Sequence, residues 1–177
     1  MMLGIRLAVV SGALSLFVAM PIAQAHVGSK FDANDSPSPL DIRSGAFFHT
    51  ESRLGTAVQT YGRWRASMLS KPNTNVYFIY DSKGGPAFDY FVWVHYENGE
   101  LVAKLRRTLN QGSVYLQEVP VAKEGKMLVI DFRKKAIGAG GFVRWGVITS
   151  FESRNYCKDG CWDGLPNRGM ITHNLGT

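Results

Sequence analysis

The segment FDYFVWVHYENGELVAKLRRTL (Phe88–Leu109) decides the fold class of this chain. Asn98 and Gly99 stand between two runs in which apolar and polar side chains alternate, and both tolerate the positive φ that a two-residue hairpin turn requires. The segment therefore predicts two antiparallel strands, near Phe88–Tyr96 and Leu101–Thr108, joined by that turn. Successive side chains point to opposite faces of a strand, so one face of the hairpin is apolar and should point into a core. That face carries Val92, Val94, Tyr96, Leu101, Ala103 and Leu105.

The opposite face of the same hairpin carries the candidate ligand-binding residues. The turn places Trp93 opposite Lys104 and Phe91 opposite Arg106. Aromatic rings on a flat strand surface offer a large apolar area on which sugar rings stack. Cations beside them hold carboxylates or phosphates. An alternative stays open, in which another part of the chain covers the rings and the cations only extend along them toward water.

Short β-branched and aromatic runs recur along the rest of the chain, separated by Gly, Pro, Asn and Asp. This pattern predicts an all-β fold, an antiparallel β-sandwich of the jelly-roll type with about eight strands. The segment Ser52–Leu69 also accommodates a helical turn. Trp64, Trp145 and Trp162 are expected to pack in the core or at its edge. Besides the hairpin, strands are expected near Leu40–His49, Thr56–Arg65, Asn75–Tyr80, Ser113–Val119, Met127–Arg133 and Phe142–Phe151.

The first residues predict export. Arg6 precedes an apolar run from Leu7 to Met20, which is followed by Ala23-Gln24-Ala25, a site typical of signal-peptide cleavage. We expect a signal peptide over residues 1–25 and a single secreted domain over residues 26–177, with no membrane span after cleavage. An uncleaved membrane anchor is the alternative, but the apolar run is short for a span of roughly 20 residues.

The charge of the chain favours anionic partners. The full sequence has 20 Lys+Arg and 14 Asp+Glu, and removal of the leader, in which Arg6 is the charged residue, leaves a net charge of about +5. By charge alone, a basic exported domain attracts cell-wall polymers, acidic polysaccharide, lipid headgroups or nucleic acid. The glycine-rich stretch after Arg133, Lys134 and Lys135 lacks the strand–loop–helix setting and the lysine of a phosphate-binding loop. Nucleotide binding is therefore not supported, and nucleic acid is not expected as a partner.

Both cysteines, Cys157 and Cys161, lie in the stretch NYCKDGCWDG. Export favours a disulfide between them. The bond would close a short loop, so its stabilisation should be modest and its role local shaping. A zinc site is the alternative, but two thiolates need further ligands, which no second Cys/His pair nearby supplies.

The stretch FDANDSPSPLDIRSG (Phe31–Gly45) and the C-terminal CKDGCWDGLPNRG carry the candidate metal ligands. Carboxylates and amides are hard oxygen donors, of which calcium takes about six to eight. The first stretch is not an EF-hand loop, since the glycine and the closing glutamate are missing. The ends of a domain often lie close together, so a calcium ion would hold both ends, whereas the alternative is that these residues form ordinary turns and caps. The candidate ligands are Asp32, Asn34, Asp35, Asp41, Asp159 and Asp163, with Asn167 beside them.

The sequence shows no catalytic constellation of a known type. No serine has a Gly-x-Ser-x-Gly setting, and bridged cysteines leave no Cys–His pair, so a non-enzyme is expected. One catalytic alternative rests on His26, which signal-peptide cleavage would make the first residue. This arrangement resembles lytic polysaccharide monooxygenases, in which an N-terminal histidine and a second histidine hold copper. His49, His95 or His173 would supply the second ligand, but the following VGSKF is expected to be flexible and no axial tyrosine is identifiable.

Four motifs carry a resemblance that covers essentially the whole exported chain. They are DANDSPSPLDIR (32–43), TYGRWR (60–65), FDYFVWV (88–94) and CWDGLPNRGMITH (161–173). In this order they resemble a group of small exported actinobacterial domains of unassigned function. The opening acidic motif and IYDSKGG (79–85) are more distantly similar to family-9 carbohydrate-binding and DOMON-like modules. That similarity implies a jelly-roll sandwich with structural calcium and with surface aromatics that bind sugar chains.

Fold, charge and motifs together favour an exported, non-catalytic module that binds carbohydrate or an anionic cell-wall or surface polymer and is stabilised by calcium. The alternative from a different class is an extracellular domain that docks onto another exported protein.

Overall fold

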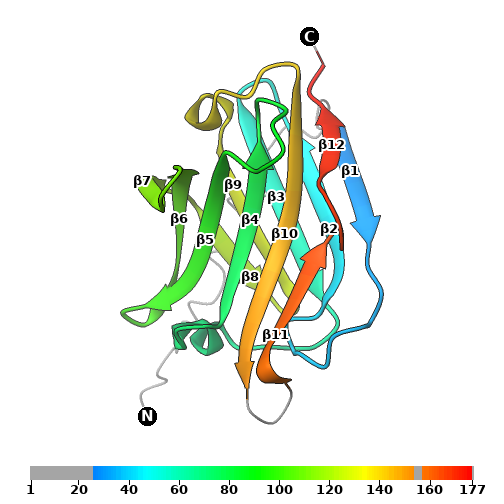
Figure 1. Ribbon diagram of the computed structural model, residues 1–177, viewed down its shortest axis with the longest axis vertical. Helices are drawn as coiled ribbons and strands as arrows, with labels where there is room; N and C mark the ends of the chain where they lie inside the picture. Colours follow the sequence, from blue (N-terminus) through cyan, green and yellow to red (C-terminus); the bar gives the residue numbers. More distant parts are fainter. Residues whose placement is uncertain (1–25, 154–156, 177) are drawn as a thin grey trace, which may run out of the picture.

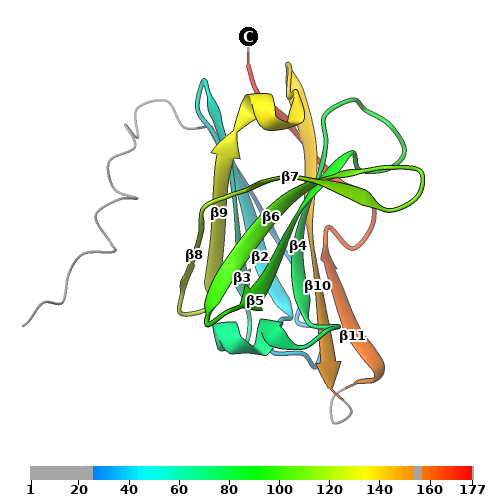
Figure 2. The same ribbon diagram turned by 90° about the vertical axis from the view of Figure 1, so that its left-hand side faces the viewer.

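The computed structural model describes residues 26–153 and 157–176, and the predicted signal peptide lies outside them. Within these residues, twelve strands, all paired antiparallel, form two sheets that face each other (Figure 1). Figure 2, turned by 90°, shows the two layers from the side. The predicted antiparallel β-sandwich is therefore confirmed.

The first sheet holds five strands. Their order across the sheet is β1 (His26–Phe31), β2 (Ile42–His49), β3 (Arg53–Thr60), β9 (Met127–Arg133) and β8 (Val121–Glu124). The second sheet holds seven strands, two of which, β11 and β12, share one edge of β10. Its order is β11 (Cys157–Leu165), β10 (Phe142–Ser153), β4 (Asn75–Asp81), β5 (Tyr90–Glu97), β6 (Glu100–Thr108) and β7 (Ser113–Glu118), with β12 (Ile171–Asn174) beside the first residues of β10.

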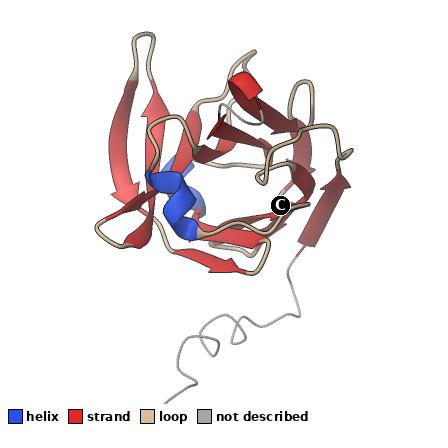
Figure 3. Ribbon diagram, turned by 90° about the horizontal axis from the view of Figure 1, so that it is seen from below, coloured by secondary structure: helices blue, strands red, loops and turns tan. Residues whose placement is uncertain are grey.

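Two short 3-10 helices lie at opposite ends of the sandwich (Figure 1). The first, η2 (Ala66–Ser70), confirms the helical turn expected in this region, and Figure 3 views the molecule from the end where it lies. The second is η3 (Lys134–Ile137). Within residues 26–153 and 157–176, no helix is both long enough and apolar enough to cross a membrane.

The hairpin has the predicted register. Trp93 pairs with Lys104 and Phe91 pairs with Arg106. Asn98 and Gly99 form the turn with φ values of 52° and 93°, the left-handed region that these two residue types tolerate best. The apolar face points into the sandwich as expected, because its central residues are at most 1% exposed. These are Val92, Val94, Ala103 and Leu105.

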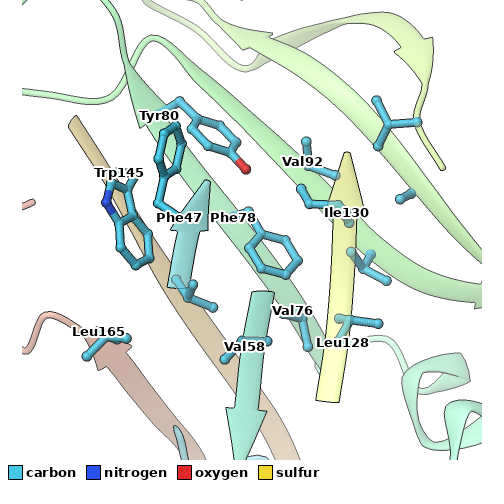
Figure 4. Packing of buried hydrophobic residues seen from close by; sticks show 14 of the residues in the cluster. Phe47, Val58, Val76, Phe78, Tyr80, Val92, Leu128, Ile130, Trp145 and Leu165 are labelled. Carbon is cyan, nitrogen blue, oxygen red and sulfur yellow. The ribbon is translucent and has the colours of Figure 1, made fainter. Parts of the chain in front are cut away.

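Large side chains from both sheets fill the space between them (Figure 4). The rings of Phe47 in β2 and Trp145 in β10 stack with centroids 5.8 Å apart. Tyr80 in β4 meets Phe132 in β9 edge to face at 5.3 Å. The buried Tyr80 hydroxyl lies 2.8 Å from Thr56 Oγ1 in the facing sheet, so its polar end is satisfied as well. Each such side chain stabilises the fold by about 1.5–3 kcal/mol, so the interface between the sheets is the main source of stability.

The sandwich has twelve strands where about eight were expected. The strands that were missed, β1, β8, β11 and β12, all lie at sheet edges. The VGSKF segment, expected to be flexible, forms most of β1 because its main chain pairs with β2 along its whole length. The β11 sequence CKDGCWDGL contains Gly and Asp, which are rare in strands, yet it pairs with β10 over most of its length. These edge segments are strands because their main chains pair with a neighbouring strand, and not because of their amino-acid composition.

Candidate functional site

An acidic cluster joins the loop between β1 and β2 to strand β11. Carboxylate oxygens of Asp35, Asp41 and Asp163 lie within 4.8 Å of one another. The two segments are tied together directly, because the main-chain N–H of Ile42 donates to Asp163 Oδ2 at 2.6 Å. The sequence prediction that acids from both ends of the predicted domain meet is consistent with this geometry.

The loop that carries Asp41 is held by its own short-range hydrogen bonds. The Ser36 N–H donates to Asp41 Oδ1 at 3.3 Å, and the Leu40 N–H donates to Ser38 Oγ at 3.0 Å. The Tyr61 hydroxyl donates to the carbonyl of Asp32 at 2.8 Å, which fixes the start of the loop. These are the turn and cap contacts that Ser and Asp commonly make, so part of the acidic segment is explained by local structure alone.

Local structure does not account for the second oxygen of Asp41. The residue is 1% exposed, and its Oδ2 is buried without a hydrogen-bond partner among the residues that the structure describes. A buried acceptor without a partner costs about 1–3 kcal/mol, and more when it is charged. A cation bound among the three carboxylates would remove this cost.

The electrostatics of the cluster support the same conclusion. Burial and the negative charge of Asp163 raise the pKa of Asp41 from 3.8 to about 6. The same two causes, in the same order, raise the pKa of Asp32 to about 6. The negative charges of Asp163 and Asp35 thus make ionisation of Asp32 and Asp41 harder. A bound divalent cation reverses this effect and favours the ionised form.

Asn167 completes the group of oxygen-bearing side chains. One atom of its side-chain amide lies 3.1 Å from Asp32 Oδ1 and 2.6 Å from the Gly164 carbonyl oxygen. If the nitrogen stands at this position, it donates to both oxygens. This orientation satisfies both atoms of the amide, so Asn167 is hydrogen-bonded into the cluster, although the sequence only placed it beside the candidate ligands.

The remaining predicted ligands are less central. Asn34 is exposed in the same loop as Asp35. The main chain of Asp159 is part of β11, but its side chain lies outside the described part of the structure.

A shallow cleft opens beside the cluster, and an exposed tryptophan stands at it. Trp162 is 66% exposed, whereas Trp64 and Trp145 are buried as expected. Trp162 was expected in the core or at its edge, and it lies on the edge strand β11 with most of its side chain exposed. The cleft is lined by Asp35, Pro37, Cys161, Trp162, Asp163 and Asn167. A second cleft is also lined by Trp162, shares Asp163 and Asn167 with the first, and adds Ile79, Ile148 and Arg168.

The predicted disulfide forms one wall of the first cleft. Cys157 and Cys161 are bonded, with their Cα atoms 5.3 Å apart, and the zinc alternative is thereby removed. Gly160, between them, has a φ of 85°, which a side chain would make unfavourable. The bond therefore constrains the β11 segment that presents Trp162, which is the local shaping predicted from the sequence.

The aromatic residues of the hairpin face are half-buried by their neighbours. The Trp93 ring stacks on His95 with centroids 4.1 Å apart, and its indole N–H donates to Asn75 Oδ1 at 2.7 Å. The Phe91 ring meets Tyr77 edge to face at 6.1 Å. The rings are packed into the outer surface of the sheet, so only part of each ring is accessible to a ligand.

The cations of the hairpin face already have partners. Lys104 Nζ lies 2.8 Å from Glu97 Oε2. The Lys104 and His95 side chains hold the pKa of the Glu97 carboxyl below its usual range. Arg106 donates through Nε to Ser113 Oγ at 2.8 Å. This face is therefore positively charged but internally paired.

Main-chain pairing joins the hairpin face to the Trp162 cleft. Across the second sheet, Trp93 pairs with Tyr77, Tyr77 with Ile148, and Ile148 with Gly164. Residues paired in this way project from the same face of a sheet. The two candidate regions are thus parts of one outer surface.

No protein-family model, curated protein or solved structure matches this chain.

Proposed function

We propose that this chain is an exported, non-catalytic binding module for carbohydrate or an anionic cell-wall or surface polymer, stabilised by calcium. One observation carries the proposal. The buried Asp41 carboxylate, with an oxygen that has no hydrogen-bond partner in the described chain, lies in a three-carboxylate cluster beside the cleft of the exposed Trp162.

Calcium fits the donors of the cluster. Asp35, Asp41 and Asp163 supply carboxylate oxygens, and Asn167 supplies an amide. An all-oxygen set of this kind suits Ca²⁺, which accepts irregular geometry and variable ligand number. The ion would link the β1–β2 loop to β11, two segments about 120 residues apart in the chain.

The neighbourhood of the ion suits a sugar polymer. Trp162 offers an exposed ring next to polar side chains of the cleft, the combination that holds one face of a sugar ring. Arg168 at the second cleft and Lys104 on the hairpin face add positive charge to the same outer surface. A polymer with carboxylates or phosphates complements this charge.

The test is sedimentation of the exported protein with insoluble polymers. Three polymers are compared: a neutral glucan, a uronic-acid polymer and a phosphate-bearing wall preparation, each with calcium and with chelator. Trp162→Ala is expected to weaken binding about ten-fold, which corresponds to about 1.4 kcal/mol. Phe142→Ala is the matched control, because Phe142 is also an exposed aromatic residue of the same sheet and lies at the other end of β10.

Chelator should weaken binding to the same extent as Trp162→Ala or more. Equal retention of the wild type and Trp162→Ala on all three polymers would contradict the proposed binding surface. Blank polymers together with one stoichiometric protein partner from culture supernatant would instead favour the protein-docking alternative.

A further inference from the structure

Two histidines meet at the end of the sandwich opposite the acidic cluster. His49 is the last residue of β2, and His173 lies in β12. His49 Nδ1 lies 2.9 Å from His173 Nε2, and the two rings are nearly perpendicular, at 77°. Figure 1 shows β1, β2 and β12 side by side near the C-terminal end of the chain.

The surroundings of the pair hold both rings in place. His49 is 4% exposed, and the Phe47 ring lies 4.8 Å from the His173 ring. Strand β1 passes so close that a Cβ at Gly28 would stand 3.0 Å from His173 Nδ1. A glycine at this position therefore leaves room for the His173 ring between β1 and the core.

The distance between the two nitrogens fits shared coordination of one ion. Two imidazole nitrogens that each lie about 2.0–2.1 Å from a metal, at about a right angle, are about 2.9 Å apart. Among the side chains that the structure describes, no carboxylate or thiol joins the pair as a third ligand. The donor set is thus nitrogen-based, and it differs in kind from the oxygen cluster at the other end.

Strand β1 brings its first residue to the same end of the sandwich. His26 and His49 are directly paired in the ladder between β1 and β2. Cleavage of the predicted signal peptide after Ala25 would convert the main-chain nitrogen of His26 into a free amine at this ladder position, as a third nitrogen ligand. Amine and imidazole nitrogens bind Cu²⁺ more tightly than the other divalent first-row ions.

We propose that the exported protein binds one Cu²⁺ ion through His49, His173 and the α-amine of His26. This site is independent of the calcium cluster and of the Trp162 cleft. It would give the chain a second metal, with nitrogen ligands at one end of the sandwich and oxygen ligands at the other.

The experiment uses the protein secreted from the full chain, with an N-terminus at His26 verified by mass spectrometry. One equivalent of Cu²⁺ is added, the electron paramagnetic resonance spectrum is recorded, and affinity is measured by competition with a chelator of known strength. The expected result is one bound Cu²⁺ whose spectrum shows coupling to several nitrogens. His173→Gln should weaken affinity by at least about 100-fold, since loss of even an outer-shell partner commonly costs 10–100-fold.

Two further variants keep the test informative. His95→Gln is the matched control, because His95 stacks on Trp93 far from the pair, and it should bind Cu²⁺ as the wild type does. A single glycine added before His26 changes no side chain but displaces the amine, and it should weaken affinity and alter the spectrum. Circular dichroism and thermal unfolding show whether each variant is folded.

Three results would each overturn the site. They are no stoichiometric binding by the wild type, equal affinity in folded His173→Gln and the wild type, and an unchanged spectrum and affinity in the glycine-extended form. None of them bears on calcium, which is measured at the other cluster.

Discussion

The hairpin β5–β6 and the edge formed by β11 with the β1–β2 loop both present an aromatic ring beside charged groups, but they differ in how those groups are satisfied. On the hairpin, Trp93 donates to Asn75 and Lys104 pairs with Glu97. At the edge, a buried oxygen of Asp41 has no hydrogen-bond partner in the described chain, and Trp162 is 66% exposed.

The comparison separates polar groups that have partners within the protein from a buried group that has none among the described residues. A polar group with an internal partner contributes about 0.5–1.5 kcal/mol to stability and has little left to offer a ligand. A buried carboxylate without a partner is a cost that the fold retains, and a bound cation would convert it into a gain. The two regions therefore predict different responses to mutation, cation and pH.

The largest effect is expected for Asp163→Ala. This change removes the acceptor of the Ile42 and Gly164 N–H groups as well as a proposed calcium ligand. Hydrogen bonds to a charged group are worth about 1.5–3 kcal/mol each, so we expect a loss of about 3 kcal/mol in unfolding free energy. Denaturant unfolding in millimolar calcium measures it, with Glu124→Gln, on an exposed edge strand of the other sheet, as control.

Calcium should stabilise the wild type and leave Asp163→Ala unchanged. An ion bound only by the folded state adds about 2.7 kcal/mol at a hundred-fold excess over Kd, which corresponds to several degrees in the unfolding midpoint. If the unfolding midpoint of the wild type is the same in chelator and in millimolar calcium, these acids form turns and caps and do not bind calcium.

The second effect is a pH dependence that calcium reverses. In chelator, the folded protein holds protons on Asp32 and Asp41 up to about pH 6, whereas the unfolded chain releases them near 3.8. The folded state thus binds more protons in this window, so the contribution of these groups to stability is full below about pH 4 and falls as the pH rises to about 6. We expect a loss of about 2–3 kcal/mol, reduced because Asp32 is partly exposed to solvent.

The comparison with Asp41→Asn isolates this contribution from the other carboxylates. The variant should lose less stability than the wild type between pH 4 and 6 in chelator. In calcium, the stability of the wild type should instead rise between pH 4 and 6. The ion binds the ionised carboxylates, so it binds more tightly as the pH rises. Parallel pH profiles of wild type and variant in chelator would show that Asp41 is not a titrating member of the cluster.

The hairpin could be predicted in detail because residues close together in the sequence determine its turn and its strand pairing. Asn98-Gly99 fixes the turn, and the two-residue period of the flanking strands then fixes every pair, including Trp93 with Lys104. The acidic cluster could not be predicted in the same detail, because it depends on two chain segments that meet only when the sandwich closes. That Asp41 retains an oxygen without a partner among the described residues is a result of packing, and no pattern in the sequence predicts it.

The exposure of Trp162 was missed for a related reason. Its strand, β11, contains glycines and aspartates and does not look like a strand, so no face could be assigned to the tryptophan. Once β11 is paired with β10, Trp162 lies opposite Ser150 at the edge of the sheet. A large side chain at an edge next to glycines has few neighbours to cover it. The paired cysteines on either side of Gly160 were the available signal that this segment has a fixed shape.

Removal of the disulfide should have a moderate effect. The bond joins residues four positions apart, and loop-closure entropy for such a short loop is worth about 2 kcal/mol. Cys157→Ser with Cys161→Ser should therefore lower unfolding free energy by about this amount and weaken calcium binding, because β11 carries Asp163. Calcium titration followed by thermal unfolding measures both, and an unchanged calcium affinity would show that the disulfide does not position the ligands.

The smallest effect is expected on the hairpin face. Lys104→Ala should leave the unfolding midpoint within about a degree of the wild type, because exposed ion pairs contribute about 0–1 kcal/mol. It should lower retention on anionic polymers two- to three-fold at low salt, and the difference should vanish near 1 M salt, where charges are screened beyond about 3 Å.

Lys30→Ala is the matched control, since it removes the same charge from β1 in the other sheet. If both variants lose retention equally, the polymer responds to net charge alone. A loss confined to Lys104→Ala extends the binding surface from the Trp162 cleft across β10 and β4 to the hairpin. In that case the partners of Lys104 would orient its charge and leave it available to the polymer.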